Sequence, residues 1–223
     1  MIDTVIFDLD GTLLNTLEDL TDSTNYALAE FGLRTRTIEE VRSFVGNGVD
    51  LLIKKAVDGA LAEETEAECL ALFKQHYSQN MNNKTRPYDG ILELIKSLLE
   101  QKYRIAIVSN KFDMAVKELN DMYFEGLFPV AIGASETVAK KPEPDAVFEA
   151  IKQLRTSREH AIYVGDSDVD VMTAKNSGLP FVGVTWGFRD EALLRKMGAK
   201  HLIHEPKQLF EFLVQRKINN KNK

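Results

Sequence analysis

An apolar run in this sequence leads directly into two aspartates. In the stretch VIFDLDGTLLNT, which spans residues 5–16, Asp8 and Asp10 are two positions apart and Gly11 follows at once. Carboxylates this close repel each other, and removing them from water is costly, so a chain that keeps both has a chemical use for them. Alternation along a strand places both on one face, and paired carboxylates can do acid–base chemistry when they hold opposite protonation states.

Three other short stretches carry residues that could join this chemistry. They are Ser109 with Asn110, the sequence KKPEPD at 140–145, and the sequence GDSDVD at 165–170. Each alone has a simple structural interpretation as a loop, a solvated lysine before a helix, or a helix start rich in acids. The last stretch also suggests a calcium loop, but it lacks the later glycine and distal glutamate of an EF-hand.

Short apolar runs alternate with amphipathic stretches from residue 103 onward, and this pattern predicts a parallel α/β sheet. We expect strands at 4–7, 104–110, 130–134, 161–166, 181–185 and 201–203, with helices at 91–101, 113–123, 144–154, 168–176 and 191–197. Asp8, Ser109 and Asp166 then stand at the carboxyl ends of strands. Open α/β sheets bind ligands at that edge, so residues far apart in the sequence should converge on one pocket.

Between residues 15 and 83 the strand pattern gives way to helical periodicity. Apolar spacing, a glycine stop at Gly32 and a possible capping box at Thr37 and Glu40 predict several helices there. We expect an α-helical domain at 15–83, inserted into an α/β core formed by 1–14 and 84–223.

Composition narrows the class of protein. Of 223 residues, 44% are hydrophobic and 28% are charged, and the net charge of −6 disfavours non-specific binding to nucleic acid. Cys69 is the single cysteine, which rules out an intramolecular disulfide and fits a reducing compartment. We see no signal-peptide pattern and no apolar run of membrane-spanning length, so we expect a cytoplasmic protein.

The four stretches, in this order and at these strand ends, resemble the haloacid dehalogenase superfamily of phosphotransferases. The resemblance covers essentially the whole chain, with the helical insert similar to that family's cap domain. It implies a doubly wound parallel sheet with strand order 3-2-1-4-5-6. Five acids would then share one pocket: Asp8, Asp10, Asp166, Asp168 and Asp170. So many carboxylates need a cation, and hard oxygen ligands suit Mg²⁺. The resemblance implies Asp8, Asp166 and the backbone carbonyl of Asp10 as ligands, with Asp170 as a supporting acid.

The resemblance also implies roles in phosphoryl transfer. Asp8 is similar to the nucleophile that forms an aspartyl phosphate, and Asp10 to the acid that protonates the leaving oxygen and later activates water. The family's dehalogenases lack that second acid. Ser109, Lys141 and backbone N–H groups near Asp10 and Asn110 would hold the phosphoryl oxygens, and Gly11 would let the backbone approach the phosphate.

Substrate choice should lie in the insert. The stretch FVGNGVDLLIKKAV at 44–57 resembles the cap loop of phosphoglycolate phosphatases, and Asn47, Lys54 and Lys55 are the expected readers of a small carboxylate. A flexible turn with two solvated lysines is the competing interpretation.

We expect a Mg²⁺-dependent phosphatase for a small phosphorylated metabolite, with a phosphoglycolate-like substrate favoured. Alternative activities are those of a phosphosugar phosphatase, a β-phosphoglucomutase-like phosphotransferase or a pyrophosphatase. An alternative of another class is a non-catalytic phosphoacceptor domain.

Overall fold

The computed structural model describes residues 1–221, with side chains described through Arg216. At its centre lies a six-stranded sheet whose neighbouring strands all pair in parallel. The strands are β1 (Thr4–Phe7), β4 (Arg104–Phe112), β5 (Val130–Ala134), β6 (Ala161–Gly165), β7 (Phe181–Val184) and β8 (Leu202–Ile203). Their order is β5-β4-β1-β6-β7-β8. Numbered along the chain, this is 3-2-1-4-5-6, as predicted.

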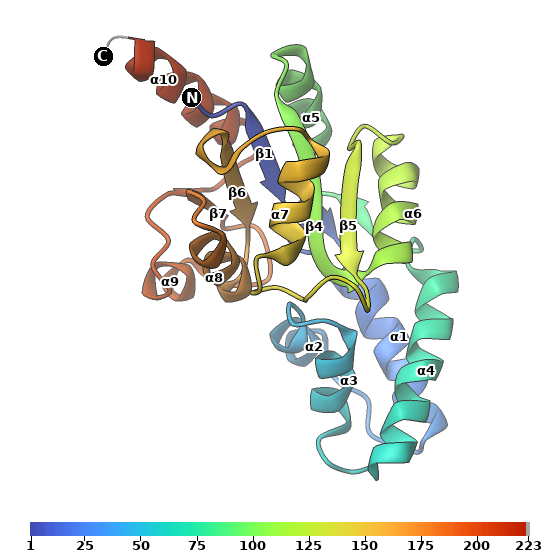
Figure 1. The fold of residues 1–223 in the computed structure, drawn as a ribbon. Coiled ribbons are helices and arrows are strands. Elements are labelled where there is room, and N and C mark those ends of the chain that lie inside the picture. The colour runs from blue at the N-terminus through green and yellow to red at the C-terminus, as the bar shows by residue number, and fades with distance from the viewer. Residues whose placement is uncertain (222–223) are drawn as a thin grey trace.

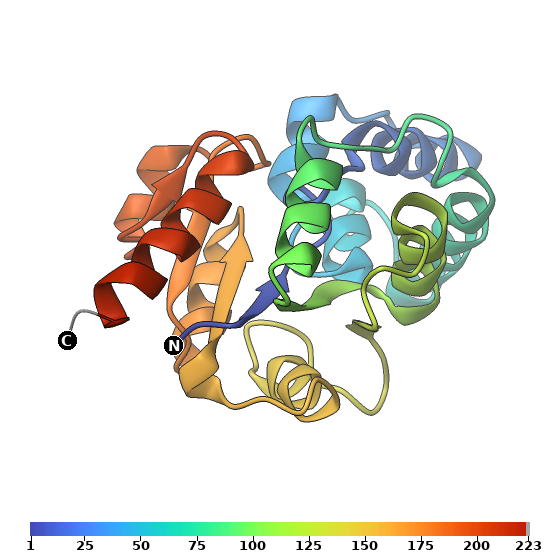
Figure 2. The same cartoon turned by 90° about the horizontal axis from the view of Figure 1, so that it is seen from above.

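Helices cover both faces of the sheet, which explains the nearly continuous apolar strands (Figures 1 and 2). Alternate residues of β1 serve the two sides. Val5 and Phe7 pack in one cluster with residues of the helices at 91–100, 113–124 and 207–221, whereas Ile6 packs in another with residues of the helices at 145–153 and 168–177. The helices are α5 (Ile91–Glu100), α6 (Asp113–Phe124), α7 (Asp145–Gln153), α8 (Asp168–Ser177), α9 (Glu191–Lys196) and α10 (Lys207–Lys221).

Four further helices lie beyond the end of the sheet at which the parallel strands finish (Figure 1). These cap helices are α1 (Leu17–Glu30), α2 (Ile38–Phe44), α3 (Val49–Val57) and α4 (Glu63–Asn80). The chain enters them through β2 (Leu14–Asn15) and leaves through β3 (Arg86–Pro87), which pair in antiparallel fashion. Asp19 of α1 accepts hydrogen bonds from the backbone N–H groups of Lys84 and Thr85, both at 3.0 Å or less. The start of the cap helices and the segment that leads out of them are therefore held together.

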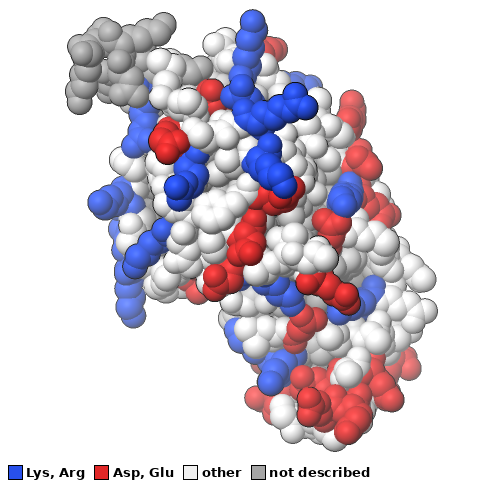
Figure 3. Space-filling model, in the orientation of Figure 1, with Lys and Arg blue, Asp and Glu red and all other residues white. Residues whose placement is uncertain are grey.

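Charge is unevenly spread over the molecule. Figure 3 shows acidic side chains gathered at the tip of the cap helices, where α4 begins with Glu63, Glu64 and Glu66. Such a surface repels a polyanion such as nucleic acid. Within residues 1–221 no helix is long and apolar enough to cross a membrane.

Candidate active site

Asp8 directly follows β1, which lies between β4 and β6, so Asp8 lies in the middle of the row of strand ends. Its backbone N–H donates to the carbonyl of Val164 at 2.9 Å, which continues the pairing of β1 with β6 by one residue. The side chain is almost buried, and its Oδ1 accepts a hydrogen bond of 2.7 Å from Lys141 Nζ. Asp8 is therefore held rigidly, with one carboxylate oxygen engaged by a cation.

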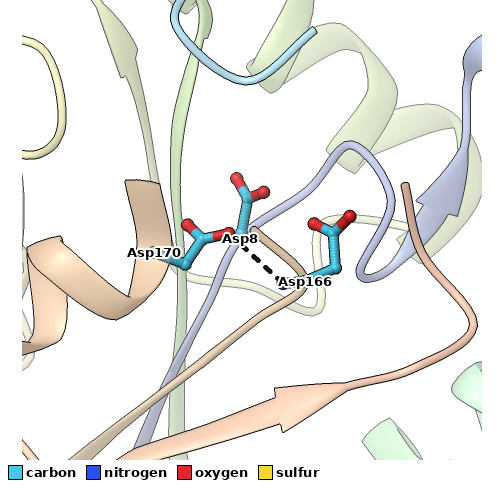
Figure 4. Close-up of side chains that lie close together, drawn as sticks. All are labelled: Asp8, Asp166 and Asp170. Carbon is cyan, nitrogen blue, oxygen red and sulfur yellow. Dashed lines mark hydrogen bonds between the residues drawn. The ribbon is translucent and has the colours of Figure 1, made fainter. Parts of the chain in front are cut away.

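Asp8, Asp166 and Asp170 form a compact acidic cluster (Figure 4), in which one oxygen from each lies within 4.8 Å of the others. Burial, followed by the charge of Asp170, raises the pKa of Asp8 well above its usual 3.8, although Lys141 opposes this shift. Burial and Asp170 likewise raise the pKa of Asp166 to about 7. Ionising all three acids here is costly, so the cluster has the charge and geometry to bind a cation.

The acids of this cluster are not equivalent. Asp170 Oδ1 accepts from Lys141 Nζ at 2.8 Å, and its Oδ2 accepts from the backbone N–H of Asp166 and from both the N–H and the hydroxyl of Ser167. Protein donors therefore occupy both of its oxygens. Asp168, two residues before Asp170, instead pairs with Arg189 at 3.3 Å. Asp170 fits a supporting acid, and Asp168 lies outside the cluster.

Lys141 is the cation that joins the two sides of the cluster. Its Nζ contacts Asp8, Asp170 and the hydroxyl of Tyr163, the last at 3.1 Å. Burial by itself lowers the pKa of Lys141, but Asp170 and Asp8 raise it well above its usual value. The ammonium group thus stays charged beside the carboxylate of Asp8.

Gly11 makes room for Asp166. The backbone of Gly11 has φ +90°, and a Cβ there would collide with the Asp166 carboxylate. That carboxylate accepts a 2.6 Å hydrogen bond from the backbone N–H of Phe188 and a 3.2 Å one from the Thr12 hydroxyl. The glycine predicted to admit phosphate therefore also lets a carboxylate pack against the loop.

Asp10 pairs with a lysine that the sequence motifs did not indicate. Lys111 Nζ lies 2.9 Å from Asp10 Oδ1 and 3.2 Å from Oδ2, and the hydroxyl of Thr16 donates to the same Oδ1 at 2.7 Å. Burial by itself lowers the pKa of Lys111, but Asp10 and then Tyr77 raise it above its usual value. Lys111 directly follows Ser109 and Asn110, so its position at a strand end was the available signal.

Ser109 and Asn110 lie where the strand-end argument places them, both nearly buried. Ser109 Oγ accepts from the backbone N–H of Lys111 at 3.2 Å. The Asn110 side chain accepts from the N–H of Lys141 at 2.7 Å and donates to the carbonyls of Lys141 and Gly46, the latter in the cap loop. Asn110 therefore ties together the strand end, the lysine loop and the cap.

These residues surround one cavity between the core and the cap helices. The core lines it with polar groups, the cap mainly with apolar side chains and glycine backbone; the lining residues are Asp8, Asp10, Ser109, Asn110, Lys111, Lys141, Leu20, Val45, Gly46, Gly48, Val49 and Leu52. Its interior has room for only a few water molecules, about 30 Å³, before the space opens toward solvent.

Three cap residues expected to read the substrate are not brought to this cavity. Asn47 and Lys54 line a different surface pocket, and Lys55 is solvent-exposed. The reason is the orientation of α3, which buries Val49, Leu52, Ile53 and Ala56 and leaves the lysines on its opposite face. In this structure these three side chains lie outside the cavity, whereas the neighbouring Gly46 and Gly48 line it.

Comparison with known proteins gives a consistent result. A sequence profile of the haloacid dehalogenase-like hydrolase family matches residues 5–184. A phosphoglycolate phosphatase of Mannheimia succiniciproducens is 35% identical over 190 residues, covering 82% of this chain and 85% of its own. One from Mesorhizobium japonicum is 36% identical over 190 residues, covering 83% of this chain and 84% of its own.

Solved structures agree with the fold. A crystal structure of a predicted phosphoglycolate phosphatase from Haemophilus somnus has a TM-score of 0.89 at 27% identity, covering 95% of this chain and 98% of its own. A Lactobacillus delbrueckii structure has a TM-score of 0.87 at 34% identity, covering 93% and 96%. These structures share the fold that carries the strand-end acids, Lys141 and the inserted cap helices. The chain belongs to the haloacid dehalogenase-like hydrolase family.

Proposed function

We propose that this protein is a Mg²⁺-dependent phosphatase that hydrolyses a small phosphorylated metabolite through an aspartyl phosphate, with a phosphoglycolate-like substrate favoured. The observation that carries the proposal is Asp8, held at the end of the central strand by Lys141 in a cavity that also contains Asp10. The similarity to phosphoglycolate phosphatases supports the choice of substrate.

The acidic cluster fits a hard divalent cation. Asp8 and Asp166 offer carboxylate oxygens from the same buried cluster, and burial, followed by the charge of Asp170, raises the pKa of both. We propose these two side chains and the backbone carbonyl of Asp10 as Mg²⁺ ligands, with Asp170 in support. When bound, the ion would balance these charges and those of the phosphoryl oxygens.

Asp8 and Asp10 carry out the two chemical steps, formation and hydrolysis of the aspartyl phosphate. An Asp8 oxygen attacks phosphorus while the bond from phosphorus to the ester oxygen breaks, and Asp10 gives that leaving oxygen its proton. Asp10 then takes a proton from water, whose oxygen attacks phosphorus and releases phosphate and the free Asp8 carboxylate. Lys141 and the Ser109 hydroxyl bind phosphoryl oxygens and stabilise their developing charge.

The cap helices control access in this proposal. Residues 15–83 act as a cap on a core formed by 1–14 and 84–223. In this proposal, substrate enters when the cap opens, and water is excluded when it closes. The paired connections β2 and β3 are the proposed hinge.

Substitution Asp8→Asn tests the proposal. It keeps the shape of the side chain and removes its charge, so turnover of phosphoglycolate with Mg²⁺ should fall by several orders of magnitude while circular dichroism is unchanged. The wild-type enzyme, quenched in acid during turnover, should carry phosphate on the peptide containing Asp8. A variant that keeps a tenth of wild-type turnover contradicts the assignment, and activity in excess chelator removes Mg²⁺ from the mechanism.

A further inference from the structure

A second buried lysine, Lys111, lines the cavity, and the proposed phosphoryl transfer assigns it no role. The Lys111 side chain is only 1% exposed. Its Nζ lies 2.9 Å from Asp10 Oδ1 and 4.6 Å from the centre of the Tyr77 ring, which belongs to cap helix α4. Among the described side chains, Asp10 is the only carboxylate within ion-pairing distance of Lys111. Asp10 and the face of the Tyr77 ring are therefore its partners among these side chains.

Lys111 can take a further anionic partner. Its ammonium group has three N–H donors, and its described hydrogen bonds go only to the two oxygens of Asp10. Hydrogen bonds between charged groups are stronger than neutral ones. A substrate that brings its own anion to Lys111 Nζ supplies such a bond. The site thus favours a leaving group with negative charge near the ester oxygen.

The position of Lys111 limits how far that anion can be from the ester oxygen. Asp10 must lie against the ester oxygen, and Lys111 Nζ is in direct contact with Asp10. In phosphoglycolate a single methylene separates the ester oxygen from the carboxylate. The carboxylate can therefore reach Nζ while the ester oxygen stays at Asp10.

The apolar side chains on the cap side disfavour bulkier or more polar leaving groups. Leu20, Val49 and Leu52 of the cap helices line the same cavity with apolar side chains. They provide no hydrogen bonds for the hydroxyls of a sugar or for the extra oxygens of a second phosphate, and an unpaired polar group in such a site is costly.

We propose that Lys111 binds the carboxylate of the substrate and thereby selects short phosphorylated hydroxy acids over neutral phosphate esters. This inference rests on the proposed function, because it requires Asp8 and Asp10 to act on a phosphate ester in this cavity. The competing receptor is the N-terminus of α3, where Gly48 and Val49 line the cavity from the cap side.

Matched substrates and variants test the role of Lys111. The substrates are phosphoglycolate, 2-hydroxyethyl phosphate, in which a neutral alcohol replaces the carboxylate, and pyrophosphate. The variants are Lys111→Gln, Lys111→Arg and the control Lys117→Gln, which alters an exposed lysine of α6 paired with Asp113. For each, kcat and KM are measured separately, and circular dichroism and thermal melting report folding.

Wild-type enzyme should prefer phosphoglycolate, and Lys111→Gln should reduce its preference over 2-hydroxyethyl phosphate by roughly tenfold to a hundredfold. Lys111→Arg should keep part of the preference because it keeps the charge, and Lys117→Gln should keep all of it. Glycolate should also inhibit hydrolysis of 2-hydroxyethyl phosphate by the wild type and much less by Lys111→Gln.

The failures of the two proposals can be told apart. A wild type without preference for phosphoglycolate contradicts the proposed function, whatever Lys111 does. If the wild type has the preference and Lys111→Gln keeps it, the inference is overturned and α3 becomes the receptor. Equal losses on both esters also overturn it, because Lys111 then acts only through Asp10. A stronger loss on pyrophosphate than on phosphoglycolate assigns Lys111 to a phosphate rather than a carboxylate.

Discussion

Arg189 joins the core to the cap, and Arg189→Gln should weaken cap closure. Its guanidinium donates to the carbonyl oxygens of Arg42 at 2.8 Å and Val45 at 2.6 Å, and its Nε lies 3.3 Å from Asp168. The side chain is only 13% exposed. Both carbonyls belong to the segment that leads from α2 into the cavity-lining loop. Arg189 is therefore placed to hold that loop against the core.

The size of the effect follows from the surroundings of each contact. The bond to Val45 is partly buried and has a charged donor, and such bonds contribute ~1.5–3 kcal/mol. The bond to Arg42 is exposed and the ion pair with Asp168 is partly so, and contacts of this kind add only ~0–1 kcal/mol. Since ~1.4 kcal/mol is a factor of ten, the closed state should lose roughly tenfold to a hundredfold in relative population.

Kinetics and hydrogen exchange measure this loss together. For Arg189→Gln, KM for phosphoglycolate should rise by up to that factor, because part of the binding free energy now closes the cap. Amide exchange at residues 42–50 should become faster. The control is Arg195→Gln on α9, which removes an exposed arginine paired with Glu191 and should change neither quantity. A KM within twofold of the wild type, together with unchanged exchange at 42–50, refutes the proposed role of Arg189.

Three further predictions concern other parts of the site. Lys54→Gln combined with Lys55→Gln should change kcat/KM for phosphoglycolate less than about twofold, because both lysines face away from the cavity; a selective tenfold loss contradicts this. Without metal, thermal stability should fall as pH rises through about 7, because the raised pKa of Asp166 makes the folded state bind a proton that the unfolded state releases near pH 3.8. Mg²⁺ should therefore raise the melting temperature more at alkaline than at acidic pH, and an equal rise at both is the contrary result. Gly11→Ala should abolish most activity because its Cβ meets the Asp166 carboxylate, whereas Gly32→Ala, which has a similar backbone but open space, should lower only stability; assays of turnover and melting separate the two effects.

The strands and the order of the site residues could be predicted because their signals are local. Short apolar runs marked β1, β4 and β6, and the polar residue after each run marked a strand end. Parallel strands place those ends at one edge, and the strand order implied by the family resemblance makes Asp8, Ser109 and Asp166 neighbours there. The capping box at Thr37 and Glu40 could also be predicted, because residues three apart in sequence make both of its hydrogen bonds.

Other features depended on contacts between distant segments. Asp10 and Lys111 are 101 positions apart, and only the packing of β1 beside β4 shows that they form an ion pair. The sequence likewise did not show which face of α3 lines the cavity. Helical periodicity reveals that apolar and basic faces differ, but not which neighbour each face meets.

The sequence by itself determined the sheet, the helical insert and the acids that meet at the strand ends, since periodicity and chain order specify them. Tertiary structure alone decided that Lys111 rather than Lys54 or Lys55 lines the cavity, and that Asp170 has both oxygens occupied by protein donors. The physical reason is that burial and charge pairing are properties of the space between elements, and that space exists only after the elements have packed.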